Sequence, residues 1–148
     1  MSFNVNLSSF RDGEPFAIDE QCVREAFGSA LASSGQERDT WRLEYGDDSC
    51  DVFVTRLPVN GSGIAGLTIQ RPLTDRQLWD SIHQVLECGN ILLFYLGCPA
   101  PLVANERTSS HVPALLLEAL GSPVAARSGA DIIREWALVS PGHALGED

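Results

Sequence analysis

Residues 64–97 read IAGLTIQRPLTDRQLWDSIHQVLECGNILLFYLG, and this stretch decides the fold class of the chain. Its first seven residues read as a strand that stops at Pro72, because proline cannot donate a hydrogen bond to a sheet. A helical pattern follows. Residues 91–96 then form an apolar run with no polar alternate, which predicts a central strand covered on both faces. The rest of the chain is expected to supply that cover.

The helix in this stretch has clear boundary signals. Thr74 is a suitable N-cap residue, and Gln77 three positions later completes a capping-box pattern. Gly89 stands where a helix C-terminus favours glycine. Between these ends, apolar residues recur at helical spacing and form one stripe, made of Leu78, Trp79, Ile82, Val85 and Leu86. The stretch therefore predicts an amphipathic helix.

The remaining segments extend this pattern in both directions. Period-2 alternation or short apolar runs predict strands at residues 3–7, 41–45, 50–55, 101–105 and 124–126. The strand at residues 101–105 is expected to be a short edge strand. Helical spacing and capping residues predict helices at residues 20–33, 109–120 and 128–136. Asp19 is expected to cap the first, Ser109 or Ser110 to start the second with Gly121 at its end, and Ser128 to cap the third. This order predicts an α+β fold, with a mostly antiparallel sheet of about five to six strands and three to four helices packed on it. Residues 1–140 are expected to form one domain and residues 141–148 a flexible tail.

Composition and charge restrict the class of partner. The chain has 148 residues, of which 44% are hydrophobic, so a real core is expected and disorder is not. The formal net charge of −10 argues against nucleic acid or an anionic membrane surface as a partner and suits a basic protein. All ten basic residues are Arg, which we interpret as the codon bias of a GC-rich bacterial genome. We predict a cytoplasmic protein, because no signal peptide is visible and the longest apolar run is too short for a bilayer.

The cysteines and histidines form no recognisable catalytic or metal-binding motif. Cys22, Cys50 and Cys88 lie inside predicted elements and are expected to be small core residues. Without a CxxC pair or an HExxH sequence, no metal, no cofactor and no enzymatic activity are predicted. The alternative is a small enzyme that uses Cys98, in a loop, with one of the three histidines, which are His83, His111 and His143.

Two further motifs have a structural and a functional interpretation. The sequence GSGIAG matches the GxGxxG pattern at residues 61–66, but the following residues read as a strand, so a hairpin is expected instead of a nucleotide site. Acidic residues gather in two predicted turns, Asp47, Asp48 and Asp51 in one and Asp12 and Glu14 in the other. The first group lacks the ligand spacing of an EF-hand, so its default interpretation is a solvated turn. The functional interpretation of both groups is a surface that binds a basic partner.

In size, acidity and α+β layout the chain resembles the immunity proteins encoded beside bacterial polymorphic or contact-dependent toxins. This resemblance implies that it binds a cognate toxin domain and neutralises it by occluding the active site. A toxin with a basic cleft would be attracted by the acidic surface. The candidate binding residues are Asp47, Asp48, Asp51, Asp12 and Glu14.

A second class shares the predicted order of elements. Residues 19–120, with a helix, three strands, a helix, two strands and a helix, resemble the layout of type III secretion chaperones. Those chaperones are also small and acidic and are usually dimeric, so this alternative includes a homodimer. An adjacent toxin gene, effector gene or metabolic operon would separate the immunity protein, the chaperone and the Cys98 enzyme.

Overall fold

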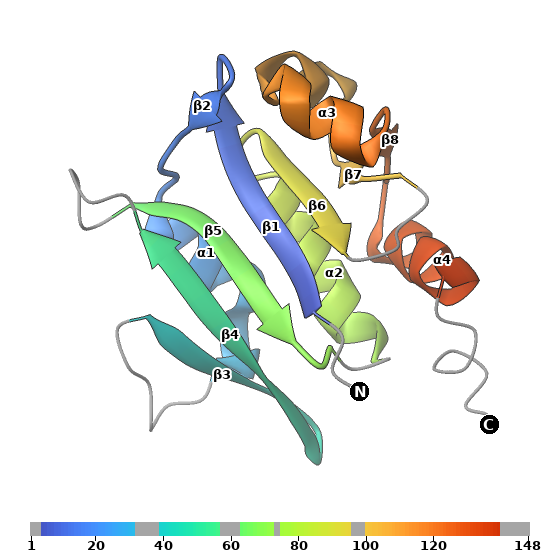
Figure 1. Cartoon of the computed structure of the whole chain (residues 1–148). Helices are drawn as coiled ribbons and strands as arrows, with labels where there is room; N and C mark the ends of the chain where they lie inside the picture. The colour runs from blue at the N-terminus through green and yellow to red at the C-terminus, as the bar shows by residue number, and fades with distance from the viewer. Residues whose placement is uncertain (1–3, 32–38, 57–62, 73–74, 96–99, 140–148) are drawn as a thin grey trace.

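The chain folds around one mostly antiparallel sheet (Figure 1). The computed structural model describes residues 4–31, 39–56, 63–72, 75–95 and 100–139. Eight strands lie in the order β3-β4-β5-β1-β6-β7-β8, with β2 paired to β1 beside this path. Their bounds are β1 Asn4–Arg11, β2 Glu14–Pro15, β3 Thr40–Tyr45, β4 Asp48–Arg56, β5 Ile64–Gln70, β6 Ile91–Tyr95, β7 Leu102–Val103 and β8 Val124–Ala125. The predicted α+β class is confirmed, with more strands than the sequence indicated.

The N-terminal strand lies in the middle of this sheet. β1 pairs antiparallel with β5 on one side and with β6 on the other, so that Leu7 stands opposite both Leu67 and Leu93. β7 pairs antiparallel with β6 and parallel with β8. The strand predicted at residues 101–105 is therefore internal, and the prediction that it forms an edge was wrong.

Helices cover the two faces of the sheet unequally. Their bounds are α1 Glu20–Phe27, α2 Arg76–Leu86, α3 Ala114–Leu120 and α4 Gly129–Val139, with 3-10 turns η1 Gly28–Ala30 and η2 Glu106–His111. α1 and α2 lie across one face, and α2 also packs against α4 (Figure 1). α3 and η2 pack on the opposite face, over β6 and β7. Among the described residues, no helix has the length and apolar character needed to cross a membrane.

The main core lies between the sheet and α1, α2 and α4. Two tryptophans, Trp41 from β3 and Trp79 from α2, are fully buried there. The predicted stripe of α2 faces this core with Leu78, Ile82, Val85 and Leu86. In β6, Leu92 and Leu93 are both 0% exposed although they point to opposite faces, which confirms the predicted central strand.

The first two helices begin where the cap residues allow. Asp19 caps α1 as predicted, and its side chain accepts a hydrogen bond from the Gln21 amide. α1 ends at Phe27, because Gly28 adopts a positive φ of 56° and a 3-10 turn follows, so the helix is shorter than residues 20–33. In α2 the N-cap is Asp75, which accepts from the Gln77 amide at 2.8 Å. The predicted cap, Thr74, lies outside the described residues.

The C-terminal helices follow the predicted pattern with shifted starts. Asn105 caps the 3-10 turn η2, and α3 begins only at Ala114, after the serines predicted to start it. Gly121 ends α3 with a φ of 98°, as expected. The hydroxyl of Ser128 accepts from the Asp131 amide at 3.3 Å, which confirms the predicted cap of α4.

A disulfide joins Cys22 of α1 to Cys88, just after α2, across 66 residues of sequence. Both residues are half-buried at the packed surface between the two helices. The prediction that they are small core residues was therefore wrong. Their spacing gave no signal, because partners so distant in sequence are brought together only by the packing of α1 on α2. Cys50 lies buried in the main core, as predicted.

Candidate binding face

The sheet face opposite α1 and α2 is the candidate site, and we call it the outer face. Register places its side chains in rows across the strands. One row crosses five strands through Thr40, Phe53, Thr68, Asn6 and Phe94. The neighbouring row contains Thr55, Gly66, Ser8 and Leu92, and the next toward the β3–β4 turn contains Arg42, Asp51, Gln70 and Asn4. These three rows thus form a largely polar surface with two phenylalanines, Phe53 and Phe94.

Helices cover only the part of the outer face that β6 and β7 form. α3 and η2 bury Leu92 and Val103 at the β6–β7 side. In the part of the chain that the structure describes, no helix lies over the outer face of β3, β4 and β5 (Figure 1). Phe53 in β4 is consequently 39% exposed. An exposed aromatic on an uncovered sheet is suited to contact another protein.

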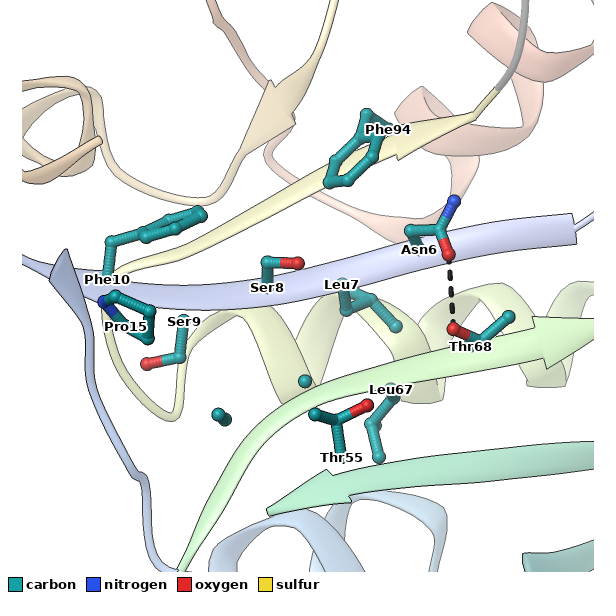
Figure 2. Close-up of a pocket in the computed structure, with 12 residues that line it drawn as sticks. Asn6, Leu7, Ser8, Ser9, Phe10, Pro15, Thr55, Leu67, Thr68 and Phe94 are labelled. Atoms are coloured by element: carbon teal, nitrogen blue, oxygen red, sulfur yellow. Dashed lines mark hydrogen bonds between the residues drawn. The ribbon is translucent and has the colours of Figure 1, made fainter. Parts of the chain in front are cut away.

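A hollow of about 350 Å³ opens on the outer face beside β1 (Figure 2). It forms where β1 and β5 separate, because their pairing ends at Ser8 and Gly66 and Ile64 pairs with Ile18 instead. Aromatic and proline rings stand at its sides, from Phe10, Pro15 and Phe94. Every described residue that lines it is uncharged.

Glycine is required at the floor of the hollow. A Cβ built on Gly66 would lie 2.9 Å from the carbonyl oxygen of Leu7, which is closer than real Cβ contacts. The backbones of β1 and β5 therefore approach each other too closely for any larger residue. Because Gly66 has no side chain, the floor is bare backbone at this point.

Hydroxyl and amide groups supply the polar part of the hollow. Asn6 and Thr68 hydrogen-bond to each other across β1 and β5 at 3.1 Å (Figure 2). Ser9 differs from them: it is only 2% exposed, and its hydroxyl has no hydrogen-bond partner among the described residues. Ser9 stands opposite Ile91 of the main core, so its side chain points to the helix-covered face. A buried hydroxyl without a partner is uncommon in folded proteins.

The structure disperses the predicted acidic trio of the β3–β4 hairpin. Asp51 lies on the outer face, opposite Arg42. Asp48 pairs with Tyr45, whose side chain is buried on the helix-covered face, so Asp48 points to that side. Asp47 lies in the exposed turn between the strands. The trio therefore surrounds the hairpin tip and is not a patch on one face. Glu44, on the outer face beside Arg42, was missed although strand alternation indicates it.

The second predicted acidic pair lies at the other end of the sheet. Asp12 and Gly13 both have positive φ, 52° and 84°, which is the conformation of a type I′ hairpin turn between β1 and β2. His111 holds this turn by accepting a hydrogen bond from the Asp12 amide at 3.2 Å. Glu14 is exposed in β2. The two acidic groups thus lie at opposite ends of the sheet (Figure 1).

A charged network on the helix-covered side connects α1 to β4. Arg56, with a side chain 8% exposed, contacts Glu20 at 2.8 Å and Asp39 at 2.7 Å. Arg24 contacts the same Glu20 at 2.7 Å and stacks over the Trp41 ring at 4.5 Å. Burial alone would raise the pKa of Glu20, but the hydrogen bonds from Arg56 and Arg24 outweigh it, and the pKa lies below the ordinary value. This network stabilises the fold and does not reach the outer face.

The candidate catalytic residues are not brought together by the described structure. His83 lies against the Ala126 carbonyl oxygen at 2.9 Å, as expected for a packed structural histidine. His111 holds the β1–β2 turn. Cys98 and His143 lie outside the described residues. No group of three potential metal ligands occurs within the described ranges.

The GSGIAG sequence leads into a strand, as predicted, while its first two residues and the expected hairpin turn lie outside the described residues. Gly66 lies inside β5, and the chain continues as strand to Gln70 instead of entering a helix. The helix N-terminus that a dinucleotide phosphate needs does not follow this motif.

No protein-family model, curated protein or solved structure matches this chain.

Proposed function

We propose that this chain is an immunity protein that binds a bacterial toxin domain through the outer face and occludes its active site. The observation that carries the proposal is the uncovered outer face of β3, β4 and β5, which exposes Phe53 next to an uncharged hollow. Binding interfaces combine such aromatic anchors with a polar rim. The net charge of −10 and the acidic groups at both ends of the sheet suit a toxin with a basic cleft.

Location in the cytoplasm is a further part of this proposal. The Cys22–Cys88 disulfide is the observation that weighs against it, because disulfides persist mainly in oxidising compartments. Trapping of thiols in intact cells with an alkylating reagent decides this point. Alkylated Cys22 and Cys88 would support the cytoplasm, and an intact disulfide would favour an oxidising compartment.

One specific observation favours a second candidate, a secretion chaperone. From α1 to α3 the elements follow the order α1-β3-β4-β5-α2-β6-β7-α3, which is the order that suggested this class. The chain differs in placing an additional strand, β1, in the centre of the sheet.

Co-expression with the product of the adjacent gene tests both functions. An immunity protein is expected to form a stoichiometric complex and to restore growth of cells that express the toxin domain. A complex with a secreted, non-toxic effector would favour the chaperone. Failure to bind the adjacent product and to restore growth would contradict the immunity function.

Charge reversal tests the contribution of the acidic residues. We expect Asp47→Lys, Asp48→Lys and Asp51→Lys together to weaken toxin binding about tenfold or more at low salt, with the fold intact. The matched control reverses three exposed acids elsewhere, Glu25, Glu87 and Glu118, and changes the net charge equally. Equal affinities of the two folded triple variants, measured by calorimetry, would exclude the hairpin acids as contacts.

A further inference from the structure

We propose that His111 is a pH-sensitive latch on the β1–β2 turn, and that its protonation cancels the charge of Asp12. The inference concerns one nitrogen of the His111 ring and the two polar groups of Asp12 that face it. It rests on the proposed function only for its consequence, which is weaker binding of a basic toxin at low pH.

The Nδ1 atom of His111 faces both an N–H group and a carboxylate oxygen of the same residue. The Asp12 amide donates to it at 3.2 Å, and Oδ1 of the Asp12 carboxylate lies 3.6 Å from it. The amide requires Nδ1 to be an acceptor, whereas the carboxylate can bind it only as a donor. The protonation state of the ring therefore decides which of the two groups Nδ1 binds.

The geometry of the turn is that of the neutral ring. Because an N–H group donates to Nδ1, the lone pair of this nitrogen accepts and the ring proton belongs on Nε2. The Asp12 carboxylate then receives no hydrogen bond from Nδ1, and the side chain of Asp12 is 84% exposed. In this state Asp12 presents a full negative charge to a partner.

Protonation reverses the role of Nδ1. Both ring nitrogens of a charged histidine are donors, so Nδ1 would face the Asp12 amide donor to donor and lose this hydrogen bond. The carboxylate, 3.6 Å away, becomes an acceptor of opposite charge, and the pair carries no net charge. Histidine side chains take up a proton between about pH 5 and 8, so this exchange of partners falls within the physiological range.

The surrounding contacts do not depend on pH, which confines the change to one nitrogen. The Gly13 amide donates to the backbone carbonyl of His111 at 2.9 Å, and a carbonyl does not titrate. Val112, the next residue, is only 5% exposed and belongs to the same buried cluster as Phe10 of β1. The 3-10 turn η2 therefore stays attached to the β1–β2 turn in both states.

Charged side chains also stand on each element next to His111. They are Arg11 of β1, Glu14 of β2, Glu106 and Arg107 of η2, and Glu118 of α3. Among the described residues, Asp12 alone lies within ion-pair distance of the His111 ring. The exchange at Nδ1 therefore involves Asp12 and no other charged group of the described structure.

An NMR titration of the full chain, labelled with ¹⁵N, from about pH 8 to about pH 5.5 tests the latch. We expect the Asp12 amide proton to shift upfield as it loses its hydrogen bond, with the same midpoint as the ring protons of His111. The Gly13 amide should shift less, because its acceptor is a carbonyl. No shift of the Asp12 amide, or a midpoint different from that of the ring, would overturn the proposal.

Three variants assign the shift to His111. The side-chain oxygen of His111→Asn accepts as Nδ1 does but does not titrate, so the Asp12 amide should keep its high-pH position throughout. The control His83→Gln, in α2, should retain the shift. Asp12→Asn keeps the backbone amide and removes the carboxyl, so the shift should also remain there. A shift that survives in His111→Asn or disappears in Asp12→Asn would contradict the latch.

Affinity for the toxin domain tests the consequence separately. Wild type and His111→Asn should bind equally at about pH 8, and wild type should bind about threefold more weakly than His111→Asn at about pH 5.5. Equal affinities at both pH values, with the NMR shift present, would retain the latch and exclude the turn as a toxin contact. Restored growth of toxin-expressing cells without the NMR shift would retain the immunity function and exclude the latch.

Discussion

The two faces of the sheet are built from alternate residues of the same strands, and they differ in what they contact. On the helix-covered face, β4 and β5 contribute Val52 and Ile69, both fully buried against the main core. On the outer face, the next residues along these strands are Phe53, which is 39% exposed, and Gln70. The first set therefore determines whether the chain folds, and the second is free to bind a partner.

The contrast explains why a large apolar residue is tolerated in an exposed position. Phe53 is larger than any aliphatic core residue, yet it has no helix above it in the described structure. The exposed part of the ring would be buried only when another molecule binds to this face. Single exposed apolar residues are common on protein surfaces, so it is the position of Phe53 on an uncovered sheet face beside the hollow that points to binding.

The largest expected effect on stability comes from shortening a side chain in the core. The same change on the outer face provides the comparison. Ile69→Ala should lower the free energy of unfolding by about 3 to 4 kcal/mol, because it leaves a cavity in the core. Phe53→Ala removes more atoms but should cost less than about 1 kcal/mol, since the ring is already partly in water. Urea unfolding of both variants measures the difference. Similar losses for the two variants would mean that the two faces are equally part of the core.

Removal of the disulfide should have the next largest effect. Cys22→Ser with Cys88→Ser is expected to lower the free energy of unfolding by about 3 kcal/mol, because the cross-link closes a long loop between α1 and α2. The outer face should retain its binding, since the disulfide lies on the opposite side of the sheet. Thiol counting under non-reducing denaturation provides the check. The chain has four cysteines, so one disulfide leaves two thiols, and a count of four would contradict the bond.

A smaller effect is expected from the charged network around Arg56. Arg56→Met should cost about 2 kcal/mol, below the range of about 3 to 5 kcal/mol for a fully buried ion pair, because Asp39 is half-exposed. The loss should also depend on pH. The folded pKa of Glu20 is lowered from 4.5, so its contribution is present above that pH and disappears as the pH falls through the folded pKa.

The difference between wild type and Arg56→Met reports on the contacts that Arg56 makes with Glu20 and Asp39. Asp131 also has a lowered pKa, held down first by the Arg127 amide, but it titrates alike in both proteins. Wild type should therefore lose more stability than Arg56→Met as the pH falls below about 4.5. Parallel stability profiles for the two proteins would contradict the role of the network.

Local patterns in the sequence predicted the elements of this fold well. The alternation in residues 41–45 and 50–55 gave the β3–β4 hairpin, and the apolar run after Gly89 gave β6. These features are decided by neighbours in sequence. The capping pattern located α2 within a residue or two, although the N-cap is Asp75.

Features that depend on distant residues were not accessible from one sequence. The insertion of β1 between β5 and β6, the Cys22–Cys88 disulfide and the internal position of β7 all result from tertiary packing. The candidate site was predicted only in part. Charge identified the acidic turns, but it could not show that Asp48 points away from Asp51 or that an uncharged hollow opens on the outer face beside β1. In the sequence, Ser9 cannot be distinguished from other polar residues of a strand. That its hydroxyl is buried without a hydrogen-bond partner is evident only from the described structure.

The most direct test of the account is the affinity of Phe53→Ala for the toxin domain against which the protein protects. Leu115→Ala is the matched control, since Leu115 is 79% exposed on α3, away from the uncovered strands. We predict about tenfold weaker binding for Phe53→Ala and unchanged binding for Leu115→Ala. Unchanged affinity of a stably folded Phe53→Ala, or a loss only in Leu115→Ala, would contradict the assignment of the outer face as the binding surface.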